Sequence, residues 1–84
     1  MKISIITITF NAEATLTRTL NSVFTQSYKD IEHIIIDGNS SDKTLEICKS
    51  YSHISKIISE PDNGVYDAFN KGLKLATGDV IGFL

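Results

Sequence analysis

Apolar residues follow two alternating patterns along this chain, short β-branched runs and stretches with apolar residues three or four positions apart. The β-branched runs cover residues 2–9, 31–37 and 54–59, and a fourth run begins at residue 79 and reaches residue 84. Continuous runs of this kind are typical of strands that helices cover on both faces of a parallel sheet. The pattern therefore predicts four strands, and the most apolar of them contains Ile34, Ile35 and Ile36.

Three stretches between the runs predict helices. The first follows Asn11, which we expect to act as its N-cap with Glu13 in the first turn, and we expect this helix to end near residues 26–27. Its apolar stripe consists of Leu16, Leu20, Val23 and Phe24. The second helix is expected over residues 42–52, capped by Ser41 or Asp42. The third is expected over residues 65–76, where the apolar spacing is most regular, and Gly78 is its predicted C-terminal stop.

The order β-α-β-α-β-α-β predicts an α/β fold. With right-handed crossovers it gives three layers, a mostly parallel sheet with helices on both faces. A chain of 84 residues has room for one domain. Nothing follows the fourth strand to cover it, so we expect residues 1–84 to be a single partial domain, the front portion of a larger one truncated after its fourth strand.

Composition narrows the classes of function. A hydrophobic content of 42% and a mean hydropathy of +0.03 are typical of a globular chain. A net charge of −2, with lysines scattered along the chain, argues against a nucleic-acid partner. The single cysteine, Cys48, excludes an internal disulfide and is interpreted as a small core residue. His33 and His53 are interpreted as solvated strand ends.

Polar side chains gather where the predicted strands end, the edge at which parallel sheets bind ligands. Asp37 ends an apolar strand and is followed by a small polar loop. Neither G-x-G-x-x-G nor a P-loop is present, so carboxylates and amides suited to a base and ribose remain. These are Asn11, Asp37, Asp42, Asp62, Asn63 and Asp67. Structural roles remain open for some of these residues. Asp37 could be a turn residue and Asp42 a helix cap. Lys71 could either form an ion pair with Asp67 or contact a phosphate.

Four segments in order resemble the N-terminal half of family 2 glycosyltransferases, which have the GT-A fold. The segments are S-I-I-T-I-T-F-N-A-E at residues 4–13, I-I-I-D-G-N-S-S-D-K-T at 34–44, E-P-D-N-G-V-Y-D-A-F-N-K-G at 60–72 and A-T-G-D-V-I-G-F-L at 76–84. Together they cover essentially the whole chain. The resemblance implies transfer of a sugar from a nucleotide-diphosphate donor, with UDP favoured, to an acceptor hydroxyl.

The resemblance also implies roles for individual residues. Asp37 would accept a hydrogen bond from the N–H of a uracil-like base, and Lys71 would face the diphosphate. The remaining members of the implied nucleotide site are Thr7, Thr9, Asn11 and Glu13 around the nucleoside, and Asp62, Asn63 and Gly64 closing over the base.

The family's D-x-D motif, which holds Mg²⁺ or Mn²⁺ against the diphosphate, is expected just after Leu84, and the general base later still. We therefore expect this chain to bind the nucleoside, to hold no metal and to be inactive in transfer. The acceptor is unspecified, a saccharide or lipid-linked saccharide. The resemblance suggests polysaccharide or glycolipid assembly in the cytoplasm, at the inner face of the membrane. The uncovered sheet near residues 80–84 is expected to drive self-association.

Two other classes of function compete with this interpretation. In a flavodoxin-like signalling module Asp37 would be a phosphoacceptor, but Thr9, Phe10 and Asn11 stand where the accompanying acids are required. A non-catalytic nucleotide-binding domain is the second alternative. Metal-dependent donor hydrolysis by the full-length protein would separate it from the transferase.

Overall fold

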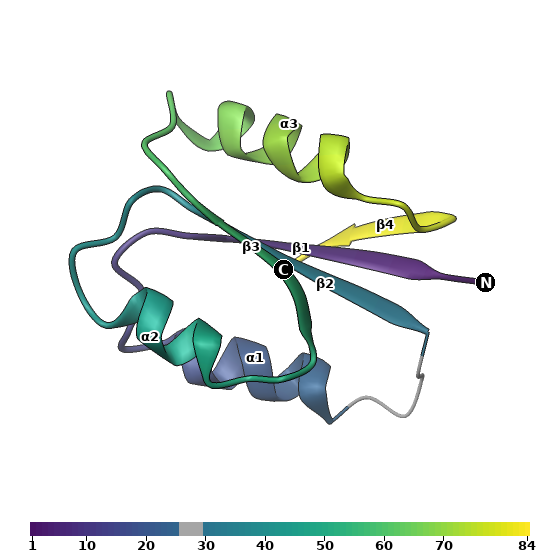
Figure 1. The fold of residues 1–84 in the computed structure, drawn as a ribbon, viewed down its shortest axis with the longest axis horizontal. Helices are drawn as coiled ribbons and strands as arrows, with labels where there is room; N and C mark the ends of the chain where they lie inside the picture. Colours follow the sequence, from purple (N-terminus) through teal and green to yellow (C-terminus); the bar gives the residue numbers. More distant parts are fainter. Residues whose placement is uncertain (26–29) are drawn as a thin grey trace.

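The computed structural model of this protein describes residues 1–25 and 30–84. A four-stranded sheet lies between two helical layers, with α3 on one face and α1 and α2 on the other (Figure 1). The strands are β1 (Ile3–Thr9), β2 (Ile31–Asp37), β3 (Ile54–Ser59) and β4 (Val80–Phe83). The helices are α1 (Leu16–Phe24), α2 (Thr44–Lys49) and α3 (Val65–Leu75). The predicted end of the first helix at residues 26–27 lies outside the described residues.

All neighbouring strands of the sheet are parallel. Their order is β3-β2-β1-β4, with β1 paired along its whole length to β2 from Ile3↔Ile31 to Thr9↔Asp37. All three carboxyl ends of β1, β2 and β3 therefore reach the same edge, where Gly38 N–H donates to the Thr9 carbonyl and Glu60 N–H to the Asp37 carbonyl. The predicted α/β class, three-layer arrangement and parallel sheet are confirmed.

The sheet separates two cores because side chains alternate between its faces. Toward α3, Ile6, Ile34 and Ile36 pack against Ala68; toward α1 and α2, Ile35 packs with Leu16, Leu20 and Cys48. Helix α3 lies so close to β1 that a Cβ on Gly72 would stand 2.6 Å from Cγ2 of Ile6. Cys48 is fully buried, and burial, aided by the nearby Asp37 charge, raises the pKa of its thiol to about 11.

The helix ends differ from the sequence predictions. Asn11 does not cap α1: Thr15 precedes that helix without a side-chain cap, and Glu13 lies before its first turn. Neither Ser41 nor Asp42 is the N-cap of α2, because the helix begins at Thr44 and Lys43 holds that position. Asp42 Oδ1 does accept the backbone N–H of Thr44 at 3.0 Å. Helix α3 ends at Leu75, and Gly78 lies beyond it against β1. The predictions for Asn11 and Gly78 were wrong because contacts with another segment determine the backbone at these positions.

The interpretation of His33 as a solvated strand end was wrong, whereas His53, directly before β3, is partly exposed. The His33 side chain is fully buried on the face of the sheet that α1 and α2 cover. Its Nε2 lies 2.8 Å from Thr7 Oγ1, and its Nδ1 lies 3.0 Å from Nε2 of His53. Burial, with the neighbouring His53, lowers the pKa of His33 to about 4. The ring of His53 also contacts those of Phe24 and Tyr51. Both rings are neutral near pH 7, and His33 belongs to the core.

In the part of the chain that the structure describes, no helix has both the length and the apolar character that a membrane crossing needs.

Candidate functional site: a pocket at the carboxyl edge of the sheet

A pocket of about 310 Å³ lies where β1 and β2 end and α3 begins. Its size is at the lower end of the range for small-molecule sites. Its walls are mostly apolar, with a single acidic side chain among them. They are formed by Ile8, Thr9, Phe10, Gly38, Asp62, Gly64, Val65 and Ala68. Three of the residues predicted for a nucleotide site, Thr9, Asp62 and Gly64, line this pocket.

Asp62 is the carboxylate of the pocket. The loop between β3 and α3 positions it, and its Oδ1 accepts the backbone N–H of Gly64 at 3.1 Å. Its Oδ2 lies 3.1 Å from the point that a Cβ on Gly38 would occupy, with the Phe10 ring 3.4 Å from that point. Among the described residues, Oδ2 accepts no hydrogen bond. Asp62 therefore presents a free acceptor beside an aromatic ring.

Asp37 has a different environment from the one that the sequence suggested. It is fully buried, and each of its two carboxylate oxygens accepts two hydrogen bonds. The donors are Thr9 Oγ1 at 2.7 Å, the Ser40 hydroxyl, Ser40 N–H at 2.8 Å and Ser59 Oγ at 2.9 Å. Burial would raise the pKa of Asp37, but the bonds from Ser40, Thr9 and Ser59 outweigh it and lower the pKa. The carboxylate joins the ends of three strands and does not line the pocket.

Asn11 and Glu13 lie in the loop after β1, which is bound to the loop after β2. Asn11 has a positive φ of 47° and its Oδ1 accepts the Ser41 N–H at 2.8 Å, while its own N–H donates to Ser40 Oγ at 2.8 Å. The N–H of Glu13 donates to Asp42 Oδ2 at 3.2 Å. Hydrogen bonding, first of all from Thr44, lowers the pKa of Asp42. Both predicted residues hold the loops near the pocket, and neither lines it.

Asn63 and Lys71 stabilise the other wall. Asn63 N–H donates to Asp67 Oδ2 at 2.9 Å. Lys71 Nζ lies 3.1 Å from Glu60 Oε1 and 3.6 Å from Asp67 Oδ2, and it donates to the Pro61 carbonyl at 3.1 Å. The ion pair between Lys71 and Asp67 that the sequence allowed is therefore present. Its cation holds the loop that carries Asp62.

Thr7 lies away from the pocket. It is buried on the face of the sheet that α1 and α2 cover, and its hydroxyl contacts His33. The alternation of side chains along β1 explains this, because Ile6 and Ile8 point toward α3. The structure thus separates Thr7 from Asp62, although both were assigned to one site.

Phe10, Gly38 and Val65 line the pocket but were not predicted as site residues. Phe10 is 64% exposed and Val65 58% exposed, so both present apolar surface to the pocket opening. An apolar residue directly before a polar turn, as in Phe10-Asn11, was the available signal. Gly38 carries none, because its role depends on Asp62 arriving from another loop.

The described ranges, 1–25 and 30–84, contain no group of three or more His, Cys, Asp or Glu side chains that could hold a metal ion. The described residues therefore do not fit a divalent-cation site.

Comparison with known proteins identifies the family. The model of the family described as "Glycosyl transferase family 2" matches residues 4–84. The chain belongs to glycosyl transferase family 2. The predicted resemblance is confirmed, and the match covers all four strands and all three helices.

Relatives of this family 2 chain include glycosyltransferases of mycobacteria. An uncharacterized glycosyltransferase of Mycobacterium tuberculosis is 44% identical over 98% of this chain and 32% of its own length. A PGL/p-HBAD biosynthesis glycosyltransferase of Mycobacterium bovis is 40% identical over 96% of this chain and 33% of its own length. The chain spans about a third of the length of these curated relatives.

Solved structures confirm the GT-A fold. TarS 1-349 of S. aureus, crystallised with UDP-GlcNAc, superposes with a TM-score of 0.92 at 30% identity, over all of this chain and 26% of that one. The mannosyltransferase PcManGT of Pyrobaculum calidifontis, solved with GDP-Man and Mn²⁺, has a TM-score of 0.84 at 22% identity and covers 95% of this chain and 26% of its own. The second comparison bears on the fold alone.

Proposed function

We propose that this chain is the donor-binding part of a glycosyltransferase that takes its sugar from a nucleotide-diphosphate donor, with uridine as the nucleoside. The observation that carries the proposal is the free Asp62 acceptor beside Phe10 in a pocket at the carboxyl edge of a GT-A sheet. The uridine donor bound by TarS, to which the chain is 30% identical, supports the choice of base. The acceptor, in glycolipid or polysaccharide assembly, is bound elsewhere in the full-length enzyme.

Uracil fits the chemistry of this pocket. Its N3–H is a donor on the edge of a flat ring, and a carboxylate oxygen is a strong acceptor for such a group. Stacking on the exposed Phe10 ring would hold the base plane, while Ile8 and Val65 exclude water from the bond. Asp62 thus takes the role for which the sequence favoured Asp37, because all four acceptor positions of Asp37 are occupied.

The competing interpretations fit the geometry less well. A phosphoacceptor aspartate must be exposed to its phosphodonor, and Asp37 has no exposed surface. A nucleotide-binding domain without chemistry would use the same pocket, but the match to glycosyl transferase family 2 favours the donor-binding part of a transferase. We propose that this chain binds the nucleoside, and that catalysis and any Mg²⁺ or Mn²⁺ site belong to residues beyond Leu84 in the full-length transferase.

Calorimetric titration with UDP and CDP tests the proposal. Cytosine has an acceptor where uracil has N3–H, so it faces the Asp62 carboxylate unfavourably, and we expect UDP to bind about tenfold more tightly than CDP. Asp62→Asn replaces one carboxylate oxygen by a donor, and we expect it to remove that preference. Mn²⁺ should leave the affinity of this chain for UDP unchanged.

The matched control is Asp37→Asn, an isosteric change of the acid that lies outside the pocket. It should lower thermal stability and keep the UDP-over-CDP preference. Equal binding of both nucleotides by the natural chain would contradict the role of Asp62, and a preference lost only in Asp37→Asn would restore the original assignment. Absence of binding would overturn the proposal for this chain.

A further inference from the structure

We propose that Glu32 is a positioning residue that sets the register of β4 on β1 and so aims the segment after β4 at the nucleotide pocket. The effect of Glu32 on catalysis rests on the proposed function, whereas its effect on the register of β4 can be measured independently. Glu32 lies at the amino-terminal edge of the sheet, and the pocket at the carboxyl edge.

Burial alone specifies the register of β4 weakly. The strand pairs only with β1, and its Val80, Ile81 and Phe83 side chains are 45%, 39% and 47% exposed. A strand that buries neither face gains little from one register over the next. The ring of Phe83 contacts Phe69 of α3, with 4.7 Å between centroids, and the remaining determinants are polar.

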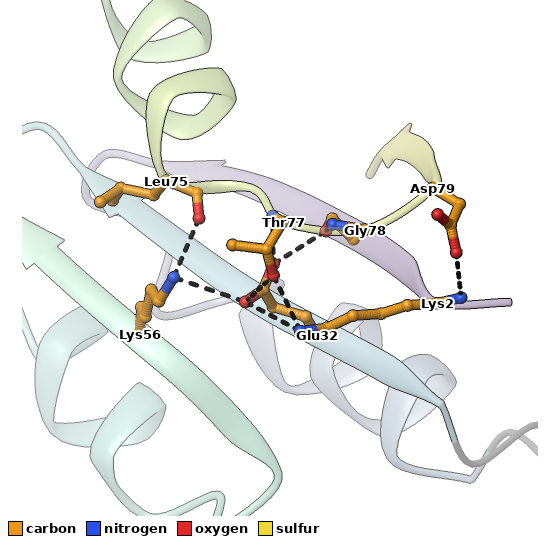
Figure 2. Close-up of polar contacts among 8 residues, drawn as sticks. Lys2, Glu32, Lys56, Leu75, Thr77, Gly78 and Asp79 are labelled. Atoms are coloured by element: carbon orange, nitrogen blue, oxygen red, sulfur yellow. Dashed lines mark hydrogen bonds and ion pairs between the residues drawn. The ribbon is translucent and has the colours of Figure 1, made fainter.

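Glu32 binds Thr77, which lies three residues before Val80, the first residue of β4. The Glu32 side chain is 6% exposed, and its Oε1 accepts Ser4 Oγ–H at 2.8 Å and Thr77 N–H at 2.9 Å. The Thr77 hydroxyl lies 3.2 Å from Oε1 and 3.1 Å from Oε2 (Figure 2). One carboxylate on β2 therefore holds both β1 and the connection between α3 and β4.

The residues after Thr77 complete this attachment. Gly78 N–H donates to Ser4 Oγ at 2.8 Å, and Asp79 N–H donates to the Lys2 carbonyl at 2.8 Å. A Cβ on Gly78 would stand 2.7 Å from Ser4 N, so the backbones touch here. The Asp79 carboxylate accepts Lys2 N–H at 3.0 Å (Figure 2). Together these contacts determine where β4 begins.

Two lysines balance the Glu32 charge. Lys2 Nζ lies 3.7 Å and Lys56 Nζ 3.4 Å from Oε2, and Lys56 also donates to the Leu75 carbonyl at the end of α3 (Figure 2). Burial would raise the pKa of Glu32, but the hydrogen bonds from Thr77 and Ser4 and the charge of Lys2 hold it at about 2. The carboxylate is ionised at neutral pH, and β1, β2, β3 and α3 all contribute to its site.

The register that follows directs the chain toward the pocket. Val80 pairs with Ile3 and Phe83 with Ile6, and Leu84 N–H donates to the Ile6 carbonyl at 3.1 Å. Continuing the same pairing places the two positions after Leu84 beside Ile8 and Thr9, which line the pocket. A slip of one residue would exchange the faces of every side chain in this segment.

Hydrogen exchange measured on this chain tests the structural half of the proposal. In Glu32→Ala we expect the Val80 and Leu84 amides to exchange at least about tenfold faster, while the Ile35 amide in β2 keeps its protection. Glu32→Gln retains an acceptor for Thr77 N–H and should restore most of the protection. Glu46→Ala, which removes an exposed acid from α2, is the control. If Glu32→Ala does not fold, Thr77→Ala takes its place.

Kinetics of the full-length transferase test the functional half. We expect the Glu32→Ala enzyme to lose about tenfold in kcat at unchanged KM for the donor, because misplacing catalytic groups slows the chemical step while the donor pocket is intact. Equal loss of protection in β2 and β4, or a higher donor KM, would show that Glu32 has a general stabilising role and would overturn the proposal. Unchanged amide exchange in the Glu32→Ala variant would also overturn it. UDP binding by the natural chain is measured alongside, so failure of the proposed function is recognised separately.

Discussion

The hydroxyl of Thr9 donates a hydrogen bond to Oδ1 of Asp37, with 2.7 Å between the two oxygens, and so joins the ends of β1 and β2. Ser59 at the end of β3 donates to the other oxygen at 2.9 Å. Asp37 thus links the ends of three strands. The pocket beside it is shaped by this link, and Asp62 supplies the exposed carboxylate.

Asp37→Ala should destabilise the fold strongly. It removes a buried carboxylate and leaves the hydroxyls of Thr9 and Ser59 and the N–H of Ser40 without their acceptor, so we expect a loss of about 3 kcal/mol in the free energy of unfolding. Urea denaturation measures it. Asp62→Ala, at a half-buried pocket position, is the comparison and should cost less than about 1 kcal/mol. Similar losses for both would contradict the division of roles.

Stability should fall as the pH is lowered from 6.5 to 5 because of His33. Its pKa is lowered to about 4 in the folded chain, so the unfolded chain binds more protons in this range and is favoured by acid. We expect a loss of roughly 1 to 2 kcal/mol from this residue over that range. His53, whose pKa burial also lowers, adds to the loss.

The variant His33→Gln isolates the effect of His33, since an amide can contact the Thr7 hydroxyl and does not titrate. Urea midpoints measured from pH 5 to pH 6.5 should change less in the variant than in the natural chain. A pH dependence that is the same in both would show that His33 accepts a proton without cost. The range stays above the pH at which Glu32 and Asp37 titrate.

Gly78→Ala should disrupt the start of β4. The added Cβ would stand 2.6 Å from Ser4 Oγ, 2.7 Å from Ser4 N and 2.9 Å from the Lys2 carbonyl, and backbone atoms cannot move aside cheaply. We expect a loss of at least about 2 kcal/mol by thermal denaturation. Gly82→Ala is the matched control within β4, because nothing lies within 4 Å of its Cβ position. If Gly82→Ala destabilises the chain as much as Gly78→Ala, the loss comes from any substitution in β4 and not from the close contact at Gly78.

The chain should self-associate through β4. The edge strand β4 exposes Val80, Ile81 and Phe83, and Leu84 follows directly after it. These four residues are 39–61% exposed, an arrangement that favours pairing with another copy. Sedimentation velocity at increasing concentration should show a shift toward dimers, and Ile81→Lys should reverse it. Leu73→Lys, on the exposed side of α3, is the control and should leave the shift in place. A monomer at every concentration would count against this interface.

Local pattern was sufficient to predict the elements and their order. The Ile34–Ile36 run and the stripe of Leu16, Leu20 and Val23 report burial within a few residues of chain, and all four strands and three helices appear where these patterns lie. Parallel connection then places the ends of β1 and β2 at one edge. The family resemblance assigned Thr9, Asp62 and Gly64 to a nucleotide site, and all three line the pocket at that edge.

What the tertiary structure decided is which polar group is exposed and which is enclosed. Asp37 ends a strand in either case, but it is buried because Thr9, Ser40 and Ser59 converge on it from three segments. Glu32 and His33 are adjacent in the sequence, yet the pleat sends them to opposite faces, one to Thr77 and the other to Thr7. Each outcome depends on partners distant in the chain, because a buried charge or dipole is stable only where other segments supply its hydrogen bonds.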